Sequence, residues 1–578
     1  MKMNPVFNLV DEPWVRVLRE DGTAEELSLR DALLSAHRYR ALAGETPTQD
    51  VAMLRLLLAV LYAALLGEDG PETAEDAMEL WKGLWDGGSF PAEAIDGYLS
   101  RWHERFWLFH AERPFLQVPV GQKGLTVENA AKLSGLAKGK PDKGIQTASK
   151  LNGAIFESGN KEKLFNIATG AEKNSLSFAE AARWLVHVLG FDDGGIKPYY
   201  PKNTELNHTD ERAKCTVSWL GSISPIYAEG GTLFETLLLN LVLLRDGAFD
   251  DEALWSAQRP TWEEERSELT ESVGTVIPDN PAQRYTMPFR RLLLVRDGER
   301  VTGFLRYVGA GFSQTAAFNE QMTLWTQTKA KKGETPSLIP RKTRMPTQLW
   351  RELGALTAGD GARRPGIVNW ISLLHSPDYR MIPWDRCTFH YVKALYDVAQ
   401  SSSMTEIIED RISFSAGLLT ELGKPWLDLI SKELTVCSRA AWQLGLLAKD
   451  LLDAEGGKVY EGKGKMTATA ESVVREAGER FYFEMDVPFR RWLLTLNSAD
   501  SSEKRAERVG ELRETVRATA LRCAEEQLRR VSPAAYSKRP DGESGAHRTA
   551  PEAWVIFKGA LYKLFSQEQT AARGGETQ

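Results

Sequence analysis

Cysteine is scarce in this sequence of 578 residues. Only four cysteines occur, and no two of them have the C-x-x-C spacing that is typical of zinc or redox sites. The dense cysteine patterns of small secreted domains held by disulfides are also missing. We therefore expect reduced, buried thiols of a cytosolic protein at Cys215, Cys387, Cys437 and Cys523.

Long apolar runs are missing as well. No stretch of about 18 apolar residues predicts a membrane span. The N-terminal sequence, MKMNPVFNLVDEPW, lacks the apolar core of a signal peptide. We therefore expect a soluble protein of the cytoplasm with no membrane partner.

The chain has no excess of positive charge. Asp and Glu number 79 against 72 Lys and Arg, which gives a net charge of −7. A protein that binds nucleic acid by itself usually has a basic surface, so the charge fits better a subunit that touches nucleic acid locally within an assembly. The 42% hydrophobic content and the 17 tryptophans exclude global disorder, and the length indicates more than one domain.

Catalytic motifs are also lacking. The eight histidines are dispersed, and neither H-E-x-x-H nor G-x-S-x-G occurs. Residues 457–463, GKVYEGK, fit most of a phosphate-loop pattern, but Gly464 stands where a Mg²⁺-binding Ser or Thr is required, so we interpret them as a loop between helices. Asp192 and Asp193 have no third acid at the spacing of a two-metal site, which favours a turn. We predict no enzyme activity, no metal and no cofactor, although an active site built from scattered residues would leave no such motif.

The first 420 residues mix strand and helix signals. Residues 7–17 alternate like a strand, residues 50–66 form a strongly apolar helix, and residues 230–244 predict another buried helix. Residues 285–305 predict two strands joined at Asp297-Gly298, a typical hairpin turn.

Beyond residue 420 the pattern becomes helical. Apolar residues recur in steps of three and four from Leu427 to Leu451, and three more helical segments follow at 467–496 (interrupted near Pro488), 503–531 and 551–566. Four long helices with short breaks indicate an antiparallel four-helix bundle. We predict an α+β fold: a large mixed domain of short strands and buried helices over 1–420, the bundle over 421–566, and a frayed tail over 567–578.

Two polar loops flank one predicted helix between residues 165 and 203. The first loop covers 166–177, the helix 178–189, and the second loop contains Asp192-Asp193-Gly194-Gly195. Glycine lets a backbone approach a groove closely, Asn and Gln suit base edges, and Lys suits phosphate. A similar polar tip occurs at 399–403. Because such residues are common in loops, they leave the target open.

The order and spacing of several segments resemble the large subunit of the type I-E CRISPR surveillance complex, Cascade (the CasA family). The resemblance spans essentially the whole chain. It rests on FNLVDEPWVRV at 7–17, FWLFHAERPFLQ at 106–117, Phe165-Asn166 at the start of a polar loop, FDDGG at 191–195, GGTLFETLLLNL at 230–241, RPTW at 259–262, TQLWREL at 347–353, and the C-terminal helices.

The resemblance implies a non-catalytic subunit of an RNA-guided antiviral complex. Such a subunit recognises the protospacer-adjacent motif in double-stranded DNA, helps to start strand separation and R-loop formation, and provides a docking platform for a nuclease-helicase. The implied partners are guide RNA, the other Cascade subunits, target DNA and that nuclease-helicase. Because the guide RNA pairs with the target, the protein needs only a local probe and need not be basic overall.

The resemblance also implies site residues, in a glycine loop, a lysine finger and a glutamine wedge. Arg306 is the candidate in place of the finger lysine, with Val308 matching the same place about as well, and two acids stand beside the glycines of the first element. The implied DNA-binding residues are Gly194, Gly195, Ile196, Lys197, Arg306, Ala399, Gln400 and Ser401. The implied loop at the guide-RNA end contains Phe165, Asn166, Lys173 and Asn174. The implied face of the bundle for DNA or small subunits contains Arg505, Arg508, Arg522, Arg529 and Arg530.

Two other interpretations stay open. The chain could be a structural scaffold subunit that does not read the motif, or a nucleic-acid enzyme with an unrecognised site. A stable assembly with guide RNA and no activity of the isolated chain separates the resemblance-based interpretation from the enzyme.

Overall fold

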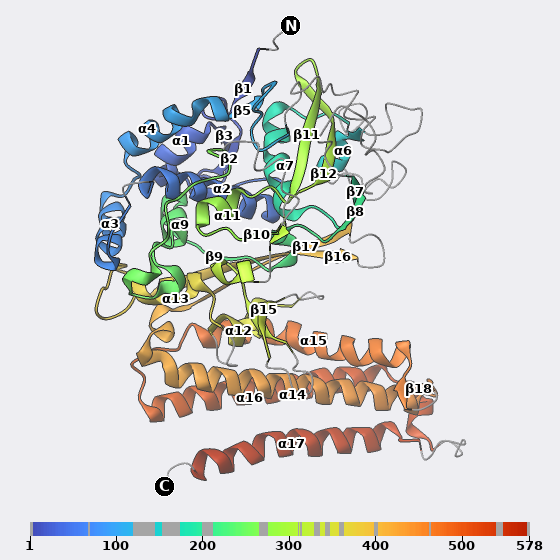
Figure 1. The fold of residues 1–578 in the computed structure, drawn as a ribbon. Coiled ribbons are helices and arrows are strands. Elements are labelled where there is room, and N and C mark those ends of the chain that lie inside the picture. Colours follow the sequence, from blue (N-terminus) through green and yellow to red (C-terminus); the bar gives the residue numbers. More distant parts are fainter. Residues whose placement is uncertain are drawn as a thin grey trace. The chain divides into compact units, whose positions relative to one another are not determined.

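The chain divides into two compact units (Figure 1). The N-terminal unit comprises Met1–Pro346, Ala362–Pro383 and Cys387–Arg411, and the C-terminal unit comprises Thr347–Gly361, Trp384–Arg386 and Ile412–Gln578. The computed structural model describes residues 4–67, 70–118, 145–152, 174–198, 212–264, 275–309, 311–312, 315–328, 336–341, 347–357, 363–397, 403–461, 464–538 and 547–574.

Helix α2 (Pro47–Leu65) forms the centre of the N-terminal unit. Thr46 caps its start by accepting a hydrogen bond from the backbone N–H of Gln49, and Pro47 occupies the first turn. The helix is long and apolar enough to cross a membrane by composition, but 83% of its apolar window is buried inside the structure, so it is a core helix. Among the described residues, the other α-helices of this unit are α1 (Leu29–Leu34), α3 (Ala74–Gly87), α4 (Ala92–Trp102), α6 (Ala148–Leu151), α7 (Phe178–Phe191), α8 (Trp219–Ser222), α9 (Leu233–Asn240), α11 (Pro281–Thr286) and α13 (Gly366–Leu374).

The strands of the N-terminal unit form several small sheets. In the part of the chain that the structure describes, three are three-stranded, in the orders β3-β2-β4, β11-β12-β6 and β17-β16-β9, and four are pairs, β1-β5, β7-β8, β10-β13 and β14-β15. Their bounds are β1 Val6–Asn8, β2 Val15–Leu18, β3 Ala24–Leu27, β4 Ala41–Leu42, β5 Trp107–Phe109, β6 Gln146–Thr147, β7 Gly195–Pro198, β8 Arg212–Cys215, β9 Ile226–Ala228, β10 Thr275–Val276, β11 Arg290–Asp297, β12 Arg300–Val308, β13 Gly311–Phe312, β14 Trp325–Gln327, β15 Leu338–Pro340, β16 Arg386–Asp397 and β17 Ser403–Ser415.

The hairpin predicted around Asp297-Gly298 is confirmed. Strands β11 and β12 are antiparallel, Asp297 faces Arg300, and Gly298 has a φ of +57°, which glycine adopts without steric cost. The helix predicted over 230–244 is shorter than expected, because α9 ends at Asn240. The Asn240 side chain accepts from the Ala228 N–H and donates to the Ala228 carbonyl, so it pairs with the end of β9 at the point where the helix stops.

A largely buried histidine ties β16 to its neighbours. The Nε2 atom of His390 lies 2.9 Å from a Glu229 carboxylate oxygen, and Nδ1 lies 3.3 Å from a Glu409 oxygen. The ring stacks on Tyr227 of β9 at a centroid distance of 4.9 Å. Burial alone would lower the pKa of His390, but the two carboxylates raise it to about 9.

We expect His390→Gln to remove a pH-dependent part of the stability. The folded-state pKa of His390 lies above its ordinary value of 6.5, so its contribution is complete below pH 6.5 and is lost as the pH rises to about 9. Chemical denaturation of wild type and variant should therefore give a difference in unfolding free energy that shrinks over this interval. The exposed His37, changed to Gln, is the control. A difference that stays constant with pH would contradict the prediction.

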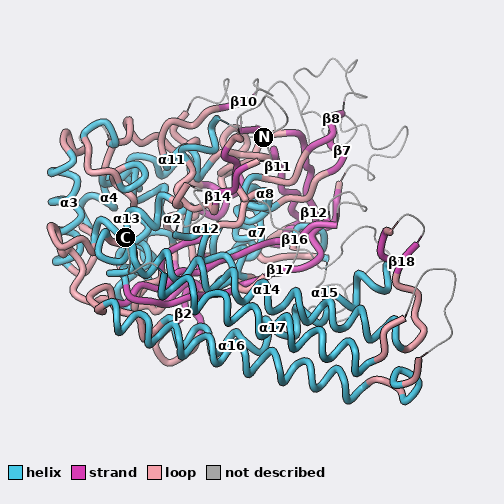
Figure 2. The backbone as a smooth tube through the Cα atoms, turned by 90° about the horizontal axis from the view of Figure 1, so that it is seen from below, coloured by secondary structure: helices cyan, strands magenta, loops and turns pink. Residues whose placement is uncertain are grey.

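The C-terminal unit is built from four long helices that lie side by side (Figures 1 and 2). They are α14 (Lys424–Ala454), α15 (Ala468–Leu493), α16 (Ser502–Arg530) and α17 (Ala550–Gly574), and α14 contacts each of the other three. The predicted apolar seam is buried at Leu427, Ile430 and Cys437 and continues to Leu451. The α+β fold with a helical C-terminal region is thus confirmed. The unit also contains α12 (Leu353–Thr357) and the small pair β18 (Tyr460–Glu461) and β19 (Lys465–Met466), which lies between α14 and α15.

Three details of the C-terminal part differ from the prediction. Helix α15 continues through Pro488, where it gives up one backbone hydrogen bond without ending. Helix α17 extends to Gly574, past the predicted start of the frayed tail at 567. Residues 347–361, predicted within the first domain, belong to the C-terminal unit, since Trp350 stacks on Phe489 at 4.5 Å.

Candidate nucleic-acid interface

Helix α7 fixes the position of the glycine turn. Its start is held by a capping box, in which the Glu180 N–H donates to the Ser177 hydroxyl and Glu180 accepts from the Ser177 N–H. At its other end, the Asp192 N–H still donates to the Val188 carbonyl at 3.0 Å, and the chain then leaves the helix. Strand β7 begins at Gly195 and pairs with β8. The turn is therefore held between helix α7 and the antiparallel pair of β7 and β8.

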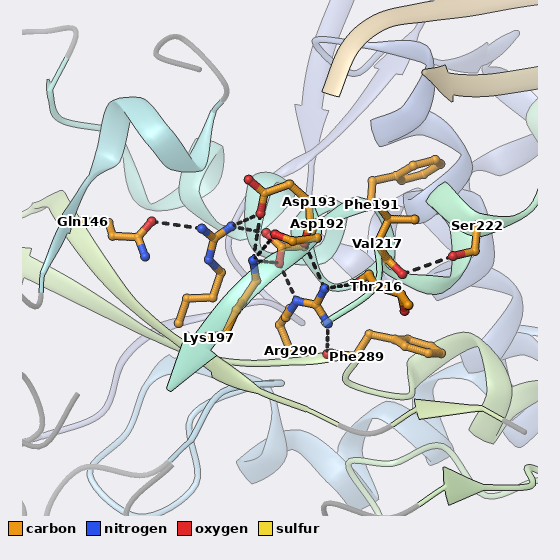
Figure 3. A network of polar contacts seen from close by, with 12 residues as sticks. Gln146, Phe191, Asp192, Asp193, Lys197, Thr216, Val217, Ser222, Phe289 and Arg290 are labelled. Atoms are coloured by element: carbon orange, nitrogen blue, oxygen red, sulfur yellow. Dashed lines mark hydrogen bonds and ion pairs between the residues drawn. The ribbon is translucent and has the colours of Figure 1, made fainter. Parts of the chain in front are cut away.

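Asp192 is the centre of a buried network of charged groups beside this turn (Figure 3). Its carboxylate accepts from Arg290 Nε and from Arg306 Nη1, and Lys197 Nζ lies 3.5 Å away. Burial alone would raise the pKa of Asp192, but the charges of Arg306, Lys197 and Arg290 more than offset this and hold its pKa well below the usual range. Asp192 is therefore ionised and serves as the counter-charge of three cations.

Asp193 completes the network. Its carboxylate accepts from Lys197 Nζ and Arg306 Nη1, both at 2.9 Å. Its carbonyl accepts from Arg290 Nη2 at 3.0 Å. Three cations against two carboxylates leave the network with a net charge of +1. The two acids beside the glycines therefore do not present an uncompensated negative charge to a phosphate.

The turn itself presents backbone and one apolar side chain. Gly194 is buried and Gly195 is half-buried with a φ of +101°, a conformation that favours glycine. Ile196, the next residue, is 72% exposed. The side chains of Lys197 and Arg306 are only 4% and 18% exposed, because both are engaged in the network. Two of the eight residues expected to bind DNA, Lys197 and Arg306, thus have side chains that are engaged in the network beside the turn.

Tyr396 links strand β16 to the end of helix α7, next to the glycine turn. Its hydroxyl donates to the carbonyl of Phe191 at 2.7 Å, immediately before Asp192. Gly221 lies against it so closely that a Cβ atom there would be 2.3 Å from the hydroxyl oxygen. The tip that follows β16, with the predicted wedge residues Ala399, Gln400 and Ser401, lies outside the described residues.

We expect Tyr396→Phe to destabilise the N-terminal unit by about 1–3 kcal/mol, because the buried carbonyl of Phe191 loses its donor. Urea denaturation of wild type and variant measures the difference. Tyr562, which is 71% exposed, gives the control Tyr562→Phe. Equal stability of Tyr396→Phe and wild type would show that the hydrogen bond contributes nothing.

The described residues of the other predicted sites are less organised. Phe165, Asn166 and Lys173 lie outside the described residues, and Asn174 is exposed and accepts a hydrogen bond from the Ser149 hydroxyl at 3.1 Å. Three of the thiols are buried as expected, but Cys215 is half-buried at the end of β8. Within the part of the chain that the structure describes, no cluster of three or more His, Cys, Asp or Glu side chains could hold a metal ion.

The predicted arginines of α16 do not form one patch. Arg505 and Arg529 are separated by roughly 36 Å along the axis of a helix that rises 1.5 Å per residue. Arg522 donates to Glu484 at 3.1 Å, and Arg529 lies 3.7 Å from Glu525. Arg505 and Arg508 are half-buried. Arg522, Arg529 and Arg530 are exposed, and the last two lie at the end of the helix. Among these five arginines, the exposed ones therefore lie in the C-terminal part of the helix, next to acids.

Comparison with known proteins assigns the family. The model of the family described as CRISPR-associated protein Cse1 matches residues 8–523. The chain belongs to the Cse1 family. The resemblance drawn from the order of the sequence segments is thus confirmed.

Relatives within the family cover most or nearly all of the chain. CasA/Cse1 of Thermus thermophilus is 28% identical over 462 residues, which cover 79% of this chain and 80% of that protein. The crystal structure of Cse1 from Thermobifida fusca is 27% identical and covers 96% of both chains with a TM-score of 0.73. Cse1 from Acidimicrobium ferrooxidans is 25% identical and covers 99% of both chains with a TM-score of 0.71. A chain of a CRISPR RNA-guided surveillance complex has the same fold, with a TM-score of 0.68 at 17% identity.

Sequence reasoning missed one central residue of the Cse1 turn, Arg290. It lies 98 residues from Asp192, and only the fold brings the two together. The sequence did contain a signal, the pair Arg290-Arg291 at the start of an apolar strand. A charged side chain at a buried strand position requires a counter-charge, so an acid had to lie nearby in the fold.

Proposed function

We propose that this member of the Cse1 family is the large, non-catalytic subunit of a CRISPR RNA-guided surveillance complex. In this role it binds guide RNA and the other Cascade subunits, recognises the protospacer-adjacent motif in double-stranded target DNA, and helps to start strand separation and R-loop formation. It then provides a docking platform for the nuclease-helicase. The observation that carries the proposal is the family match over residues 8–523.

The geometry of the glycine turn supports the DNA-reading part of the proposal. A backbone turn without side chains at Gly194 and Gly195 can approach a groove closely. The net positive charge of the network behind it favours phosphate. The exposed Ile196 adds an apolar side chain that can press against sugars or a base step. These features suit a short contact with DNA whose target sequence is read by the guide RNA.

A substitution that strains the backbone at one glycine tests whether the turn takes part in motif recognition. Gly195→Val places a β-branched side chain at a φ of +101°, at a cost of about 1–3 kcal/mol to the local backbone. In the assembled complex, we expect the ratio of affinities for targets with the correct and an incorrect motif to fall at least about tenfold, by the conversion of about 1.4 kcal/mol per decade. Gly298→Val, in the hairpin turn with a φ of +57°, is the matched control for backbone strain.

The outcomes separate the three interpretations. If complexes that contain Gly195→Val or Gln400→Ala assemble and still distinguish correct from incorrect motifs as wild type does, the chain is a scaffold that does not read the motif. Failure of the chain to assemble with guide RNA and its sibling subunits would overturn the subunit assignment. Metal-dependent nuclease activity of the isolated chain would overturn the non-catalytic role.

A further inference from the structure

Strands β7 and β8 lie side by side immediately after the glycine turn (Figures 1 and 2). Successive side chains of a strand point to opposite faces. Lys197 is buried, and its ammonium group pairs with Asp192 and Asp193. Its neighbour Ile196 is 72% exposed. The pair of strands therefore has an inner face, which carries Lys197, and an outer face, which carries Ile196.

Lys214 of β8 belongs to the outer face. It is the partner of Ile196 in the register of the pair. Residues directly opposite each other in an antiparallel pair have side chains on the same face, with Cβ atoms about 5 Å apart. Lys214 is exposed, and among the residues that the structure describes no acid forms an ion pair with it. Its ammonium group is therefore available to a ligand, unlike the three cations of the network.

The position of the outer face is fixed by contacts between β8 and the network. Just after the strand, the carbonyl of Thr216 accepts a hydrogen bond from Arg290 Nη2 (Figure 3). The Ser218 N–H donates to the carbonyl of Asp192 at 2.9 Å. The strand that carries Lys214 is thus tied to the same groups that surround the glycine turn. Since β7 begins at the turn itself, a ligand that reaches the turn also reaches the outer face.

The outer face suits the backbone of a nucleic acid. A lysine ammonium is a compact charge on a flexible stem, which can pair with a phosphate in any sequence. The apolar side chain of Ile196 lies beside it and can cover the carbon atoms of an adjoining sugar. Contacts of this kind add affinity and fix position, but they carry no sequence information.

We propose that Lys214 binds a backbone phosphate of the target DNA next to the protospacer-adjacent motif, with Ile196 packed against the adjoining sugar. The proposal rests on the proposed function, because it assumes that the glycine turn reaches DNA. It assigns the two parts of the surface different roles. The turn gives binding that depends on the motif, whereas Lys214 contributes affinity that does not.

The salt dependence of DNA binding by the assembled complex tests this contact. Affinities for targets with a correct and an incorrect motif are measured between 50 and 200 mM salt. Each phosphate contact contributes about 0.9 to the slope of log K against log salt concentration. Over this range, Lys214→Gln should therefore lose about 3.5-fold less affinity than wild type does. At low salt it should bind both targets more weakly by a similar factor.

Two variants serve as controls for the lost lysine. Lys214→Arg keeps the charge and should retain the wild-type slope. Lys82→Gln removes a lysine of α3 whose charge is already paired with Asp86 at 2.6 Å, and it should behave as wild type. Because Lys214 is exposed, Lys214→Gln should also retain the Tm of wild type.

Four outcomes would overturn the contact. A wild-type slope and affinity of Lys214→Gln, with discrimination still lost in Gly195→Val, would refute the contact and leave the proposed function intact. A loss confined to the correct motif would mean base recognition instead of a phosphate contact. Failure of Lys214→Gln to assemble would place the lysine against guide RNA or a sibling subunit. A wild-type complex that does not bind target DNA would overturn the proposed function and this contact with it.

Discussion

Glu320→Gln is expected to destabilise the N-terminal unit by about 3–5 kcal/mol, the usual effect of removing one partner of a buried ion pair. The amide keeps the shape of the side chain but removes the carboxylate that pairs with Arg55 in the core. Arg284 is a second buried cation near Glu320, so the attraction that Glu320 exerts on both cations is lost. Trp219 can still donate to the amide oxygen, which limits the change to the loss of charge.

Urea denaturation followed by tryptophan fluorescence measures this loss. Glu299→Gln, at an exposed position of the β11–β12 turn, is the matched control and should change stability by no more than about 0.5 kcal/mol. Wild-type stability of Glu320→Gln would mean that the charge of the carboxylate is not needed.

The same substitution should change how the free energy of unfolding depends on pH in acid. Burial alone would raise the pKa of Glu320, but Arg55 and Arg284 lower it from 4.5 to about 2. The contribution of the carboxylate is therefore present above pH 4.5 and is lost as the pH falls from 4.5 to about 2. Glu320→Gln should lose this part of the acid dependence.

Local patterns in the sequence predicted local structure well. The D-G pair at 297–298 identified the β11–β12 hairpin, and the apolar seam from Leu427 identified α14. Both signals depend on residues that are close together in the chain, so distant contacts had little influence on them. Where a distant contact does intervene, the prediction failed, as at Asn240, whose side chain pairs with Ala228 where α9 ends early.

The site was harder to predict, because its geometry depends on contacts across the fold. The family resemblance implied Lys197 and Arg306 as direct DNA contacts, but their side chains are engaged by Asp192 and Asp193. Arg306 lies 114 residues from Asp192, and no spacing rule connects the two. The family resemblance located the turn, whereas only the structure shows why two acids stand beside it.

Asp192→Asn should have the largest effect on the proposed DNA contact. The neutral amide would hold neither Arg290 nor Arg306 by charge, and Asp193 alone would face three cations. We expect a loss of about 3–5 kcal/mol in the stability of the N-terminal unit. We also expect at least about a tenfold loss of motif-dependent affinity, since the turn from Gly194 to Ile196 is no longer fixed. Binding that does not depend on the motif should persist, because the cations remain.

A double-mutant cycle shows whether the charge pairing is the cause. Asp192→Asn and Arg306→Gln should be non-additive by about 0.5–3 kcal/mol, as for residues in direct contact. Asp297→Asn, in the exposed hairpin turn, is the control for the loss of one acid. If Asp192→Asn lowers stability but leaves motif discrimination unchanged, the network supports only the fold. If it lowers both, and Arg306→Gln adds nothing further, the buried acids are what make the glycine turn a rigid probe.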